Sequence, residues 1–455
     1  MKKSEALHKK IIIIGAGSAG LSAQSYIKHQ TSDYLIIDKG PLGTTCARVG
    51  CMPSKSLIEA AKIFYKKKDF KKIGIQNSIK LKLNSKKFFD HVRQLTDYFS
   101  SGVVKQTLAI PQKNFIQADA IFLDTRTIKV KNKTYTADKF IIASGSNAFI
   151  PDEWLHLKKD LLISDDIFKL KTLPKTLAVV GAGPIGLELA LALSYLGVKV
   201  TVYGSHRSLG GLSDPFLMSY AKKIFQKNLR LIDEEVSGIK KNSQHKINIK
   251  TQNNSKTFDK VLIATGRKPN LTLLENLNLP LKNDKPVIND LTGQIKNTNL
   301  YIAGDMSGLH PLLHEASFDG IRAAKNALSQ KPVKIKRPVP LKITFTNPQI
   351  AIIGSSYKEL TTKKLDFEIV ESSFEDQGRS RTQFENEGHI RIYYKRTSLQ
   401  ILGAELFTHK AEHLAHFLAL AVTNKISIDK ILETPIYHPV VEEGLRTALR
   451  KALKK

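Results

Sequence analysis

Short apolar runs recur along the chain, and several of them end at a turn made of small residues. The runs at 11–14 and 177–180 each lead into a hexad with glycine at its first, third and sixth positions, and a helical stretch follows each hexad. Three more apolar runs end in small-residue turns, at 140–145, 261–266 and 300–305. Strands that alternate with helices predict a parallel α/β sheet, which binds ligands at the carboxyl ends of its strands.

The two hexads predict two dinucleotide-binding units. Their glycines are Gly15, Gly17 and Gly20 in the first hexad, and Gly181, Gly183 and Gly186 in the second. Glycine at these positions permits a tight turn, close approach of a pyrophosphate and close packing of helix on strand. The N–H groups at the start of the following helix then favour the phosphates. One hexad alone is weak evidence, whereas two in the same strand–helix context form an internal repeat.

The repeat allows the two units to be compared at the end of their second strand. Asp38 lies 23 residues after Gly15, and Gly204 lies 23 residues after Gly181. An acid at this position binds a ribose 2′-hydroxyl, so we expect Asp38 to bind an adenosine ribose. Without that acid the second unit presents no repulsion to a 2′-phosphate, which Arg207 would bind unless it points to solvent. The choice between NAD and NADP therefore stays open.

The small-residue turns at the other strand ends supply further candidate cofactor contacts. We expect Ser144, Gly145 and Gly266 to lie at ligand-binding strand ends. Asp305 is expected to accept a hydrogen bond from a cofactor hydroxyl, and it would also serve as a helix N-cap. His314 is expected to help line the cofactor region.

Length and composition limit the class of protein. At about 150 residues per domain, a chain of 455 residues suggests about three domains. A hydrophobic share of 42% with 25% charged residues is typical of a globular chain with real cores. No uninterrupted apolar stretch reaches the ~18 residues that a membrane helix needs, so no transmembrane segment is predicted. With two cysteines, a disulfide-stapled secreted scaffold is excluded.

The charge balance raises the question of a nucleic-acid partner. Lys and Arg number 71 against 41 Asp and Glu, which leaves a net charge of +30. Neither zinc-finger spacing nor an aromatic–basic motif accompanies the lysines, so we expect a solvated lysine surface, no specific nucleic acid and no membrane. The first residues superficially resemble a signal peptide, but glycines interrupt the apolar core. The segment is interpreted as strand, turn and helix, and the protein as cytoplasmic.

Both cysteines lie in the segment 43–55, as Cys46 and Cys51. Positions five apart in a regular helix are about 140° apart round its axis, so pairing them requires a local distortion, which Gly50 and Pro53 permit. A zinc site needs about four ligands, so zinc is not expected. A redox-active disulfide is the interpretation that fits, because such a bond in a reducing cytosol is usually catalytic.

In combination, these motifs and a C-terminal His-Pro resemble the FAD-dependent pyridine nucleotide–disulfide oxidoreductase family, and within it the dihydrolipoyl dehydrogenases most. The resemblance covers nearly the whole chain. It implies an α/β fold with two Rossmann-like dinucleotide-binding domains, for FAD and for NAD(P), plus a C-terminal α+β dimerisation domain. The domains it implies are an FAD-binding domain with the redox disulfide at 1–147, an NAD(P)-binding domain at 148–267, a return to the FAD-binding domain at 268–336 and the dimerisation domain at 337–455.

The resemblance also assigns roles around the cysteines. It places Cys51 against the flavin as the charge-transfer thiolate and makes Cys46 the interchange thiol that attacks substrate. It places Lys55 near the flavin, paired with Glu188 of the nucleotide-domain helix. Nearby positive charge favours a thiolate, which is the form that attacks a disulfide.

The other half of the implied chemistry lies near the end of the chain. His438 resembles the family's acid–base histidine, which takes a proton from a dithiol and returns it, and Glu443 resembles the carboxylate that orients the ring. Val440 stands where dihydrolipoyl dehydrogenases have threonine. In this family the histidine comes from the partner subunit, so a homodimer is expected. His413 and His416 have metal-ligand spacing without a third ligand, so they are interpreted as lying on an interface helix, and no metal site is predicted.

The expected function is electron transfer between a dithiol or disulfide, foremost dihydrolipoamide or lipoamide, and NAD(P) through a Cys46–Cys51 disulfide and FAD. The substrate would be a small molecule or a lipoyl domain. Three alternatives stay open: a reductase of glutathione-like or another low-molecular-weight disulfide, a soluble transhydrogenase, which would not need the cysteines, and a basic polyanion-binding flavoprotein. The Pro-Ser-Lys after Cys51 and the absence of C-terminal cysteines argue against thioredoxin and mercuric reductases.

Overall fold

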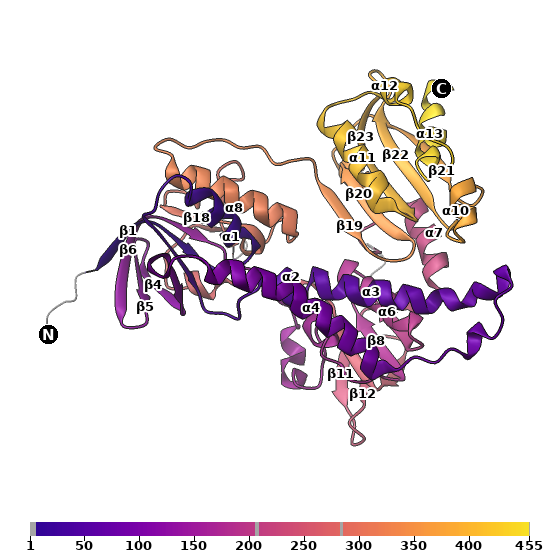
Figure 1. The fold of residues 1–455 in the computed structure, drawn as a ribbon, viewed down its shortest axis with the longest axis horizontal. Helices are drawn as coiled ribbons and strands as arrows, with labels where there is room; N and C mark the ends of the chain where they lie inside the picture. Colours follow the sequence, from indigo (N-terminus) through magenta and orange to yellow (C-terminus); the bar gives the residue numbers. More distant parts are fainter. Residues whose placement is uncertain (1–5, 205–208, 283–284, 455) are drawn as a thin grey trace. The chain divides into compact units, whose positions relative to one another are not determined.

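The computed structural model describes residues 6–204, 209–282 and 285–454, which Figure 1 draws from indigo to yellow. They divide into two compact units. Unit 1 holds the residues up to Pro53, Val92–Phe149 and Arg267–Arg337, and unit 2 holds Ser54–His91, Ile150–Gly266 and the residues from Pro338 onward. The division groups Ser54–His91 with unit 2, whereas the implied scheme keeps 1–147 together, and the domain boundaries stay a proposal.

Unit 1 is built on a mostly parallel sheet with strand order β3-β2-β1-β6-β5-β4, and β18 pairs with β6. Its strands are β1 (Leu7–Ile14), β2 (Tyr34–Asp38), β3 (Phe115–Gln117), β4 (Ala120–Asp124), β5 (Thr127–Val130), β6 (Lys133–Ile142) and β18 (Leu300–Ile302). Ile11 and Ile13 of β1 pack in one buried cluster, and Ile12 and Ile14 pack in another on the opposite face. Burial of both faces explains why a parallel strand is a continuous apolar run rather than an alternating one.

Two helices cover one face of this sheet, α1 (Ser18–Ile27) and α8 (Leu313–Leu328). They pack against each other closely, because a Cβ added at Gly320 of α8 would lie 2.1 Å from the carbonyl oxygen of Ala19 in α1. The pairing of α1 with α8 joins segments about 300 residues apart, and it fixes the helix that follows the first glycine turn.

Unit 2 contains the second glycine turn on a parallel sheet with strand order β10-β9-β8-β14. Its strands are β8 (Thr176–Val180), β9 (Lys199–Tyr203), β10 (Arg230–Ile232) and β14 (Lys260–Ile263), and an antiparallel sheet adds β11 (Gly238–Lys241), β12 (Ile247–Lys250) and β13 (Ser255–Phe258). Helix α6 (Pro184–Tyr195) follows the glycine turn, and α7 (Pro215–Phe225) connects β9 to β10. Both helices begin with proline, whose missing N–H is harmless in a first turn.

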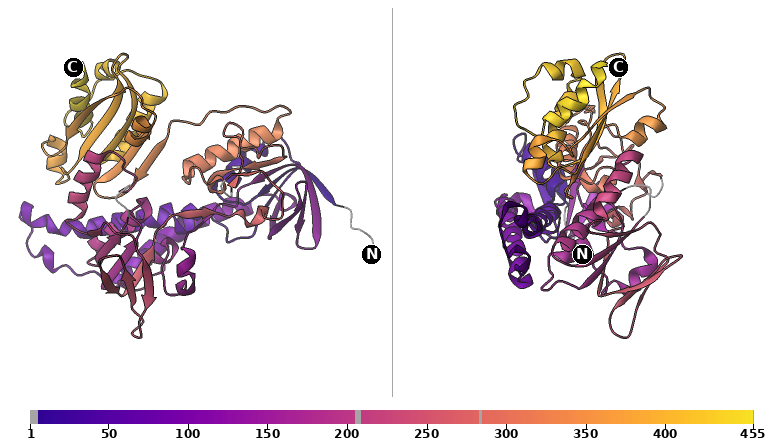
Figure 2. Two further views of the ribbon diagram at one scale, coloured as in Figure 1. Left: turned by 180° about the vertical axis from the view of Figure 1, so that it is seen from behind. Right: turned by 90° about the vertical axis from the view of Figure 1, so that its right-hand side faces the viewer.

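The C-terminal part of unit 2 is an antiparallel sheet with strand order β19-β20-β23-β22-β21 (Figures 1 and 2). Its strands are β19 (Leu341–Thr344), β20 (Gln349–Gly354), β21 (Glu368–Ser373), β22 (His389–Lys395) and β23 (Gln400–Thr408). Its helices are α9 (Tyr357–Thr362), α10 (Gly378–Thr382), α11 (Ala411–Thr423), α12 (Ile428–Glu433) and α13 (Glu443–Arg450). Leucines of α11 and α13 share one apolar core with the sheet.

Further short elements connect these parts, and the long helices α3 (Cys51–Tyr65) and α4 (Ser85–Leu108) run through segments of both units. The short elements are α2 (Thr45–Val49), α5 (Ser164–Ile167), β7 (Ser146–Ala148), β15 (Arg267–Pro269), β16 (Leu281–Lys282) and β17 (Lys285–Pro286). Among the described residues, none of the helices is both long and apolar enough to cross a membrane. The predicted α/β class, with two Rossmann-like units and a C-terminal α+β domain, is confirmed.

Candidate active site

A cavity of about 640 Å³ lies at the carboxyl edge of the unit 1 sheet, around the first glycine turn. Five of the residues predicted to bind a cofactor line it: Gly15, Gly17, Asp38, Ser144 and Gly145. They come from the ends of β1, β2 and β6, which are neighbours in the sheet. The strand-end signals in the sequence therefore converge on one cavity.

The glycines of the first turn serve different purposes. Gly15 has φ +106°, and a Cβ there would lie 2.3 Å from the carbonyl oxygen of Ala143. A Cβ at Gly20 would lie 1.8 Å from the carbonyl oxygen of Gly15, so this position is needed for close helix–strand packing. A Cβ at Gly17 would meet no described atom within 4 Å and would occupy the open side of the turn. The missing side chain at Gly17 thus leaves space for a ligand, and the missing side chain at Gly20 permits the close packing of α1 against the turn.

Asp38 is held beside this turn by two backbone N–H groups. Ala16 donates to its Oδ2 at 2.6 Å and Gly40 donates to its Oδ1 at 2.6 Å. Charge-assisted bonds of this kind hold a carboxylate firmly. The side chain is therefore fixed at the end of β2, where the predicted ribose contact requires it.

Four other residues expected near the flavin or its cofactor region are not among the described residues that line the cavity: Gly20, Lys55, Asp305 and His314. Asp305 accepts a hydrogen bond from Ser146 Oγ at 2.7 Å. The N-cap of its short helix is Ala303, so the prediction that Asp305 also serves as a helix N-cap is wrong. His314 is an exposed residue in the first turn of α8, with Nε2 3.9 Å from Glu315. Their cofactor roles stay predictions.

The two cysteines flank a break between two helices. Cys46 lies in α2, which ends at Val49, and Cys51 is the first residue of α3. Gly50 has φ −122° and ψ −113°, and a Cβ there would lie 3.1 Å from the Cα of Cys46. The chain therefore turns back over Cys46 at Gly50, so the distortion expected between the cysteines is present. Pro53 lies in the first turn of α3, where its missing N–H leaves no bond unmade.

Arg48 is a candidate site residue that was not predicted from the sequence. It lies between the cysteines and lines the unit 1 cavity together with Thr44 and Thr45. Its Nε is buried and makes no hydrogen bond to any described residue. A buried, unsatisfied guanidinium nitrogen is costly unless a partner binds there, so Arg48 is a candidate to hold an anionic ligand in the cavity. The signal in the sequence was an arginine between two cysteines in a segment expected to contact a flavin.

Unit 2 holds an ion pair between Lys55 and Glu188. The Nζ of Lys55 lies 3.0 Å from Oε2 of Glu188, and the other carboxylate oxygen accepts the backbone N–H of Phe345 at 2.8 Å. The same ammonium lies 4.2 Å from the centroid of the Phe345 ring. Glu188 is buried and Lys55 is partly exposed, so the pair fixes the direction of the lysine side chain while leaving it reachable.

His438 and Glu443 form a second titratable pair. Nδ1 of His438 lies 3.1 Å and 3.2 Å from the two carboxylate oxygens of Glu443, and Arg446 donates to one of these oxygens at 2.7 Å. The hydrogen bond with His438 is the main cause that lowers the pKa of Glu443. The imidazole is 79% exposed in the single chain and the carboxylate 17%. The carboxylate therefore stays charged and orients one ring nitrogen, while the other can reach a substrate.

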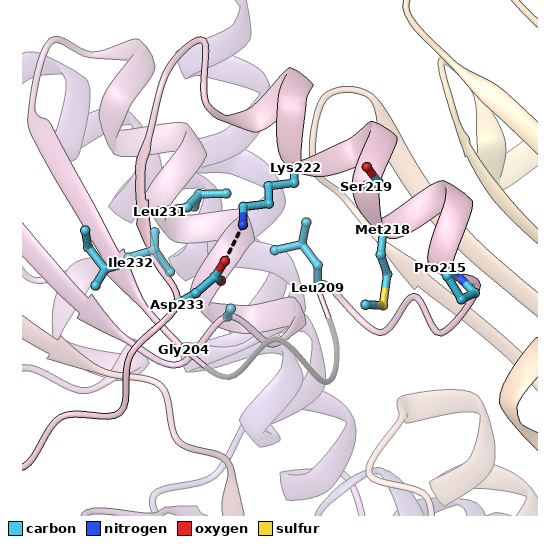
Figure 3. A pocket seen from close by; sticks show the side chains of 11 residues that line it. Gly204, Leu209, Pro215, Met218, Ser219, Lys222, Leu231, Ile232 and Asp233 are labelled. Atoms are coloured by element: carbon cyan, nitrogen blue, oxygen red, sulfur yellow. Dashed lines mark hydrogen bonds and ion pairs between the residues drawn. The ribbon is translucent and has the colours of Figure 1, made fainter. Parts of the chain in front are cut away.

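The second glycine turn repeats the geometry of the first. Gly181 has φ +116°, and a Cβ at Gly186 would lie 2.1 Å from the carbonyl oxygen of Gly181. A Cβ added at Gly183 or at Gly266 would meet no described atom within 4 Å. A cavity of about 320 Å³ lies beside this turn (Figure 3), lined by Ala182 of the turn and by the ends of β9 and β10. Arg207 lies outside the described residues.

The remaining histidine pair belongs to α11. Nδ1 of His416 lies 2.6 Å from the carbonyl oxygen of Glu412, and Nε2 of His413 lies 3.8 Å from the Glu412 carboxylate. Within the described part of the chain, no group of His, Cys, Asp and Glu has the arrangement of a metal site.

Known families match most of the chain. Residues 9–330 match the family described as Pyridine nucleotide-disulphide oxidoreductase, and residues 341–449 match its dimerisation domain. The chain is 28% identical over 451 residues to a mercuric reductase of Lysinibacillus sphaericus, covering 96% of this chain and 81% of that protein. It is 28% identical over 450 residues to a dihydrolipoyl dehydrogenase of Mycoplasma genitalium, covering 97% of this chain and 98% of that protein. Equal identity to differently named enzymes leaves the substrate open.

Solved structures share the whole fold. LpdA of Mycobacterium tuberculosis superposes with a TM-score of 0.85 at 22% identity, covering 97% of this chain and 99% of that one. The HOCl-induced flavoprotein disulfide reductase RclA of Escherichia coli superposes with a TM-score of 0.84 at 18% identity, with the same two coverages. At these identities the likeness describes the fold.

Proposed function

Because the chain belongs to the pyridine nucleotide-disulphide oxidoreductase family, we propose that it moves electrons between a small dithiol, dihydrolipoamide, and NAD(P) by way of FAD and a Cys46–Cys51 disulfide. The observation that carries the proposal is that one cavity is lined both by the first glycine turn and by residues of the cysteine segment, namely Thr44, Thr45 and Arg48. A dinucleotide held by the turn would then lie next to the redox cysteines.

The residues of unit 1 fit FAD. Asp38 would hold the adenosine ribose, and Arg48 with the N–H groups of the glycine turn would hold the pyrophosphate. When bound, FAD would supply the two-electron transfer between the thiols and nicotinamide. The chain itself supplies the thiol chemistry and the proton transfers.

The thiol step uses one substrate sulfur to open the protein disulfide. A substrate thiolate attacks Sγ of Cys46, a new sulfur–sulfur bond forms, and Cys51 leaves as a thiolate. Cys51 is the first residue of the 15-residue helix α3, whose positive end favours this thiolate. The second thiol of the substrate then attacks the substrate sulfur that is bonded to Cys46 and releases Cys46 as a thiolate. The substrate thereby loses two electrons and the cysteine pair gains them.

His438 carries out the proton transfers. It takes the proton of the attacking thiol and returns it when the substrate leaves, while Glu443 holds Nδ1 and supports the imidazolium. The exposure of the ring and the match of residues 341–449 to a dimerisation domain support delivery of His438 by a second copy of the chain. We therefore propose that the active enzyme is a homodimer.

The direct test is reduction of NAD⁺ or NADP⁺ by dihydrolipoamide, measured by absorbance with the purified, FAD-loaded protein. Turnover that is lost in Cys46→Ser, while NAD(P)H still reduces the flavin of that variant, supports the proposal. A protein whose flavin is reduced by NAD(P)H but which never oxidises dihydrolipoamide contradicts the lipoamide assignment.

A second candidate is a reductase of another low-molecular-weight disulfide. Val440 beside the His438–Glu443 pair departs from the dihydrolipoyl dehydrogenase pattern, and the same thiol chemistry run in reverse would reduce a disulfide. Consumption of NAD(P)H with glutathione disulfide or a related substrate, at a rate above that with lipoamide, would favour this candidate.

A further inference from the structure

The cavity beside the second glycine turn is lined mostly by apolar side chains, and the ion pair of Lys222 with Asp233 lies between them (Figure 3). Its apolar walls are Val202, Leu209, Pro215, Met218, Leu231 and Ile232. Such walls suit the faces of a planar aromatic ring. The volume of about 320 Å³ gives room for a base and part of its sugar.

The charged residues of the cavity lining are Lys222 and Asp233. Lys222 comes from α7 and Asp233 directly follows β10, and the two side chains point toward one another and form an ion pair (Figure 3). Their side chains are 42% and 31% exposed, so both heads remain reachable by a ligand. The pair presents one hydrogen-bond acceptor and one donor side by side.

The first unit has Asp38 at the end of its second strand, whereas this unit carries Gly204 at the end of β9. A Cβ there would lie 2.7 Å from the Cβ of Ala182 and 2.9 Å from its backbone nitrogen, so an acidic side chain does not fit. In β10, Ile232 pairs with Tyr203 of β9, which places Asp233 next to Gly204 on the neighbouring strand. In this unit an acid therefore lies at the end of the third strand, beside the position that Asp38 occupies in the first unit.

Helix α7, which carries Lys222, is held rigidly at its start. The carboxylate of Asp214 is fully buried and accepts the N–H groups of Phe216 and Leu217 at 3.0 Å and 3.3 Å. The same carboxylate accepts hydrogen bonds from Arg391 at 2.8 Å and from Tyr393 at 3.0 Å. Because the start of the helix is fixed before a ligand binds, a ligand that contacts its side chains does not have to order the helix as well.

We propose that Lys222 and Asp233 recognise the adenine base of the nicotinamide dinucleotide. Asp233 accepts a hydrogen bond from the exocyclic amine, Lys222 donates to ring nitrogen N1, and the apolar walls cover the ring faces. Hypoxanthine has a carbonyl oxygen in place of the amine and an N–H at N1, so it opposes acceptor to acceptor and donor to donor. The inference rests on the proposed function, because it takes NAD(P) as the ligand.

The experiment compares the binding of two oxidised dinucleotides that differ only in the base. Isothermal titration of the FAD-loaded protein gives Kd for NAD⁺ or NADP⁺, whichever binds tighter, and for its hypoxanthine analogue. We expect the adenine form to bind about tenfold or more tightly, as for a paired donor and acceptor on a base edge. Lys222→Met and Asp233→Leu should each lower the ratio of the two Kd values, because each variant removes one of the two contacts that distinguish adenine from hypoxanthine.

Lys223→Met is the matched control, because it removes the same charge from the next residue of α7, which is exposed and does not line the cavity. It should keep the preference for adenine. Flavin content and melting temperature check that each variant is folded. Any of three results overturns the inference: equal Kd values in the unaltered protein, a preference for adenine that is undiminished in both cavity variants, or no binding of either dinucleotide. The dithiol is absent throughout, so loss of dithiol activity, which would contradict the proposed function, is measured separately.

Discussion

Replacing single glycines of the first turn by alanine separates the packing of the fold from the binding of the ligand. In Gly20→Ala the new Cβ would lie 1.8 Å from the carbonyl oxygen of Gly15, whereas ordinary contacts begin at 3.4 Å. Helix α1 would have to retreat from β1 by more than an ångström. Overpacking of this kind destabilises by about 1–3 kcal/mol, which lowers the melting temperature by roughly 2–4 °C per kcal/mol in a domain of this size.

Gly17→Ala makes the opposite change. Its Cβ meets no described atom within 4 Å, so the apoprotein should melt at the temperature of the unaltered apoprotein. The methyl group would instead fill the space that the turn keeps for a pyrophosphate, so FAD should be lost. The assay is FAD per chain from absorbance after gel filtration, together with the melting temperature of the apoprotein by circular dichroism.

The second turn provides the control for this pair. Gly183→Ala resembles Gly17→Ala, and Gly186→Ala, with its Cβ 2.1 Å from a carbonyl oxygen, resembles Gly20→Ala. Gly183→Ala should keep its FAD and lose affinity for NAD(P). Full FAD content in Gly17→Ala, or an unchanged melting temperature in Gly20→Ala, would refute the reasoning.

Three further predictions concern side chains. Glu443→Gln removes the charge that supports His438, so oxidation of the dithiol should slow by about tenfold to a hundredfold while dye reduction by NAD(P)H is unchanged; equal dithiol rates would count against the pair. Burial alone would raise the pKa of Glu385, but the hydrogen bonds and charges of His409 and Lys66 lower it from 4.5 to about 2. This depressed pKa stabilises the fold above pH ~4.5 by roughly 3 kcal/mol, a contribution lost as the pH falls toward 2. In Glu385→Gln, the free energy of unfolding measured with urea should therefore fall less between pH 4.5 and 2 than in the unaltered protein. The same fall with pH in both proteins would contradict this prediction. Arg48→Met should weaken FAD binding about tenfold or more, measured by fluorescence titration, whereas an unchanged Kd would exclude a role in holding the pyrophosphate.

Local spacing in the sequence was enough to predict the elements of the dinucleotide sites. Gly15 and Asp38 belong to one strand–turn–helix–strand unit, so their positions at a common sheet edge follow from the pattern alone. The break between the cysteines also followed from local spacing, because positions five apart in a regular helix point in different directions. The break lies at Gly50, whose backbone angles are not helical.

Apart from the pair of Lys55 with Glu188, which the family resemblance implied, contacts between distant segments could not be predicted. The closeness of β9 to Ala182, which leaves no room for a side chain at Gly204, depends on the packing of the whole unit. The bonds of Asp214 to Arg391 and Tyr393 join residues more than 170 positions apart. No local pattern marks either partner, because each is an ordinary strand or turn residue until the chain is folded.

The central claim, that a cysteine pair and a flavin act together, is tested most directly by anaerobic reductive titration of the FAD-loaded protein with dithionite. If Cys46 and Cys51 form a redox-active disulfide, the unaltered protein should accept four electrons per flavin, two in the flavin and two in the disulfide. Cys46→Ser should accept only the two of the flavin. Uptake of two electrons by both proteins would contradict the account.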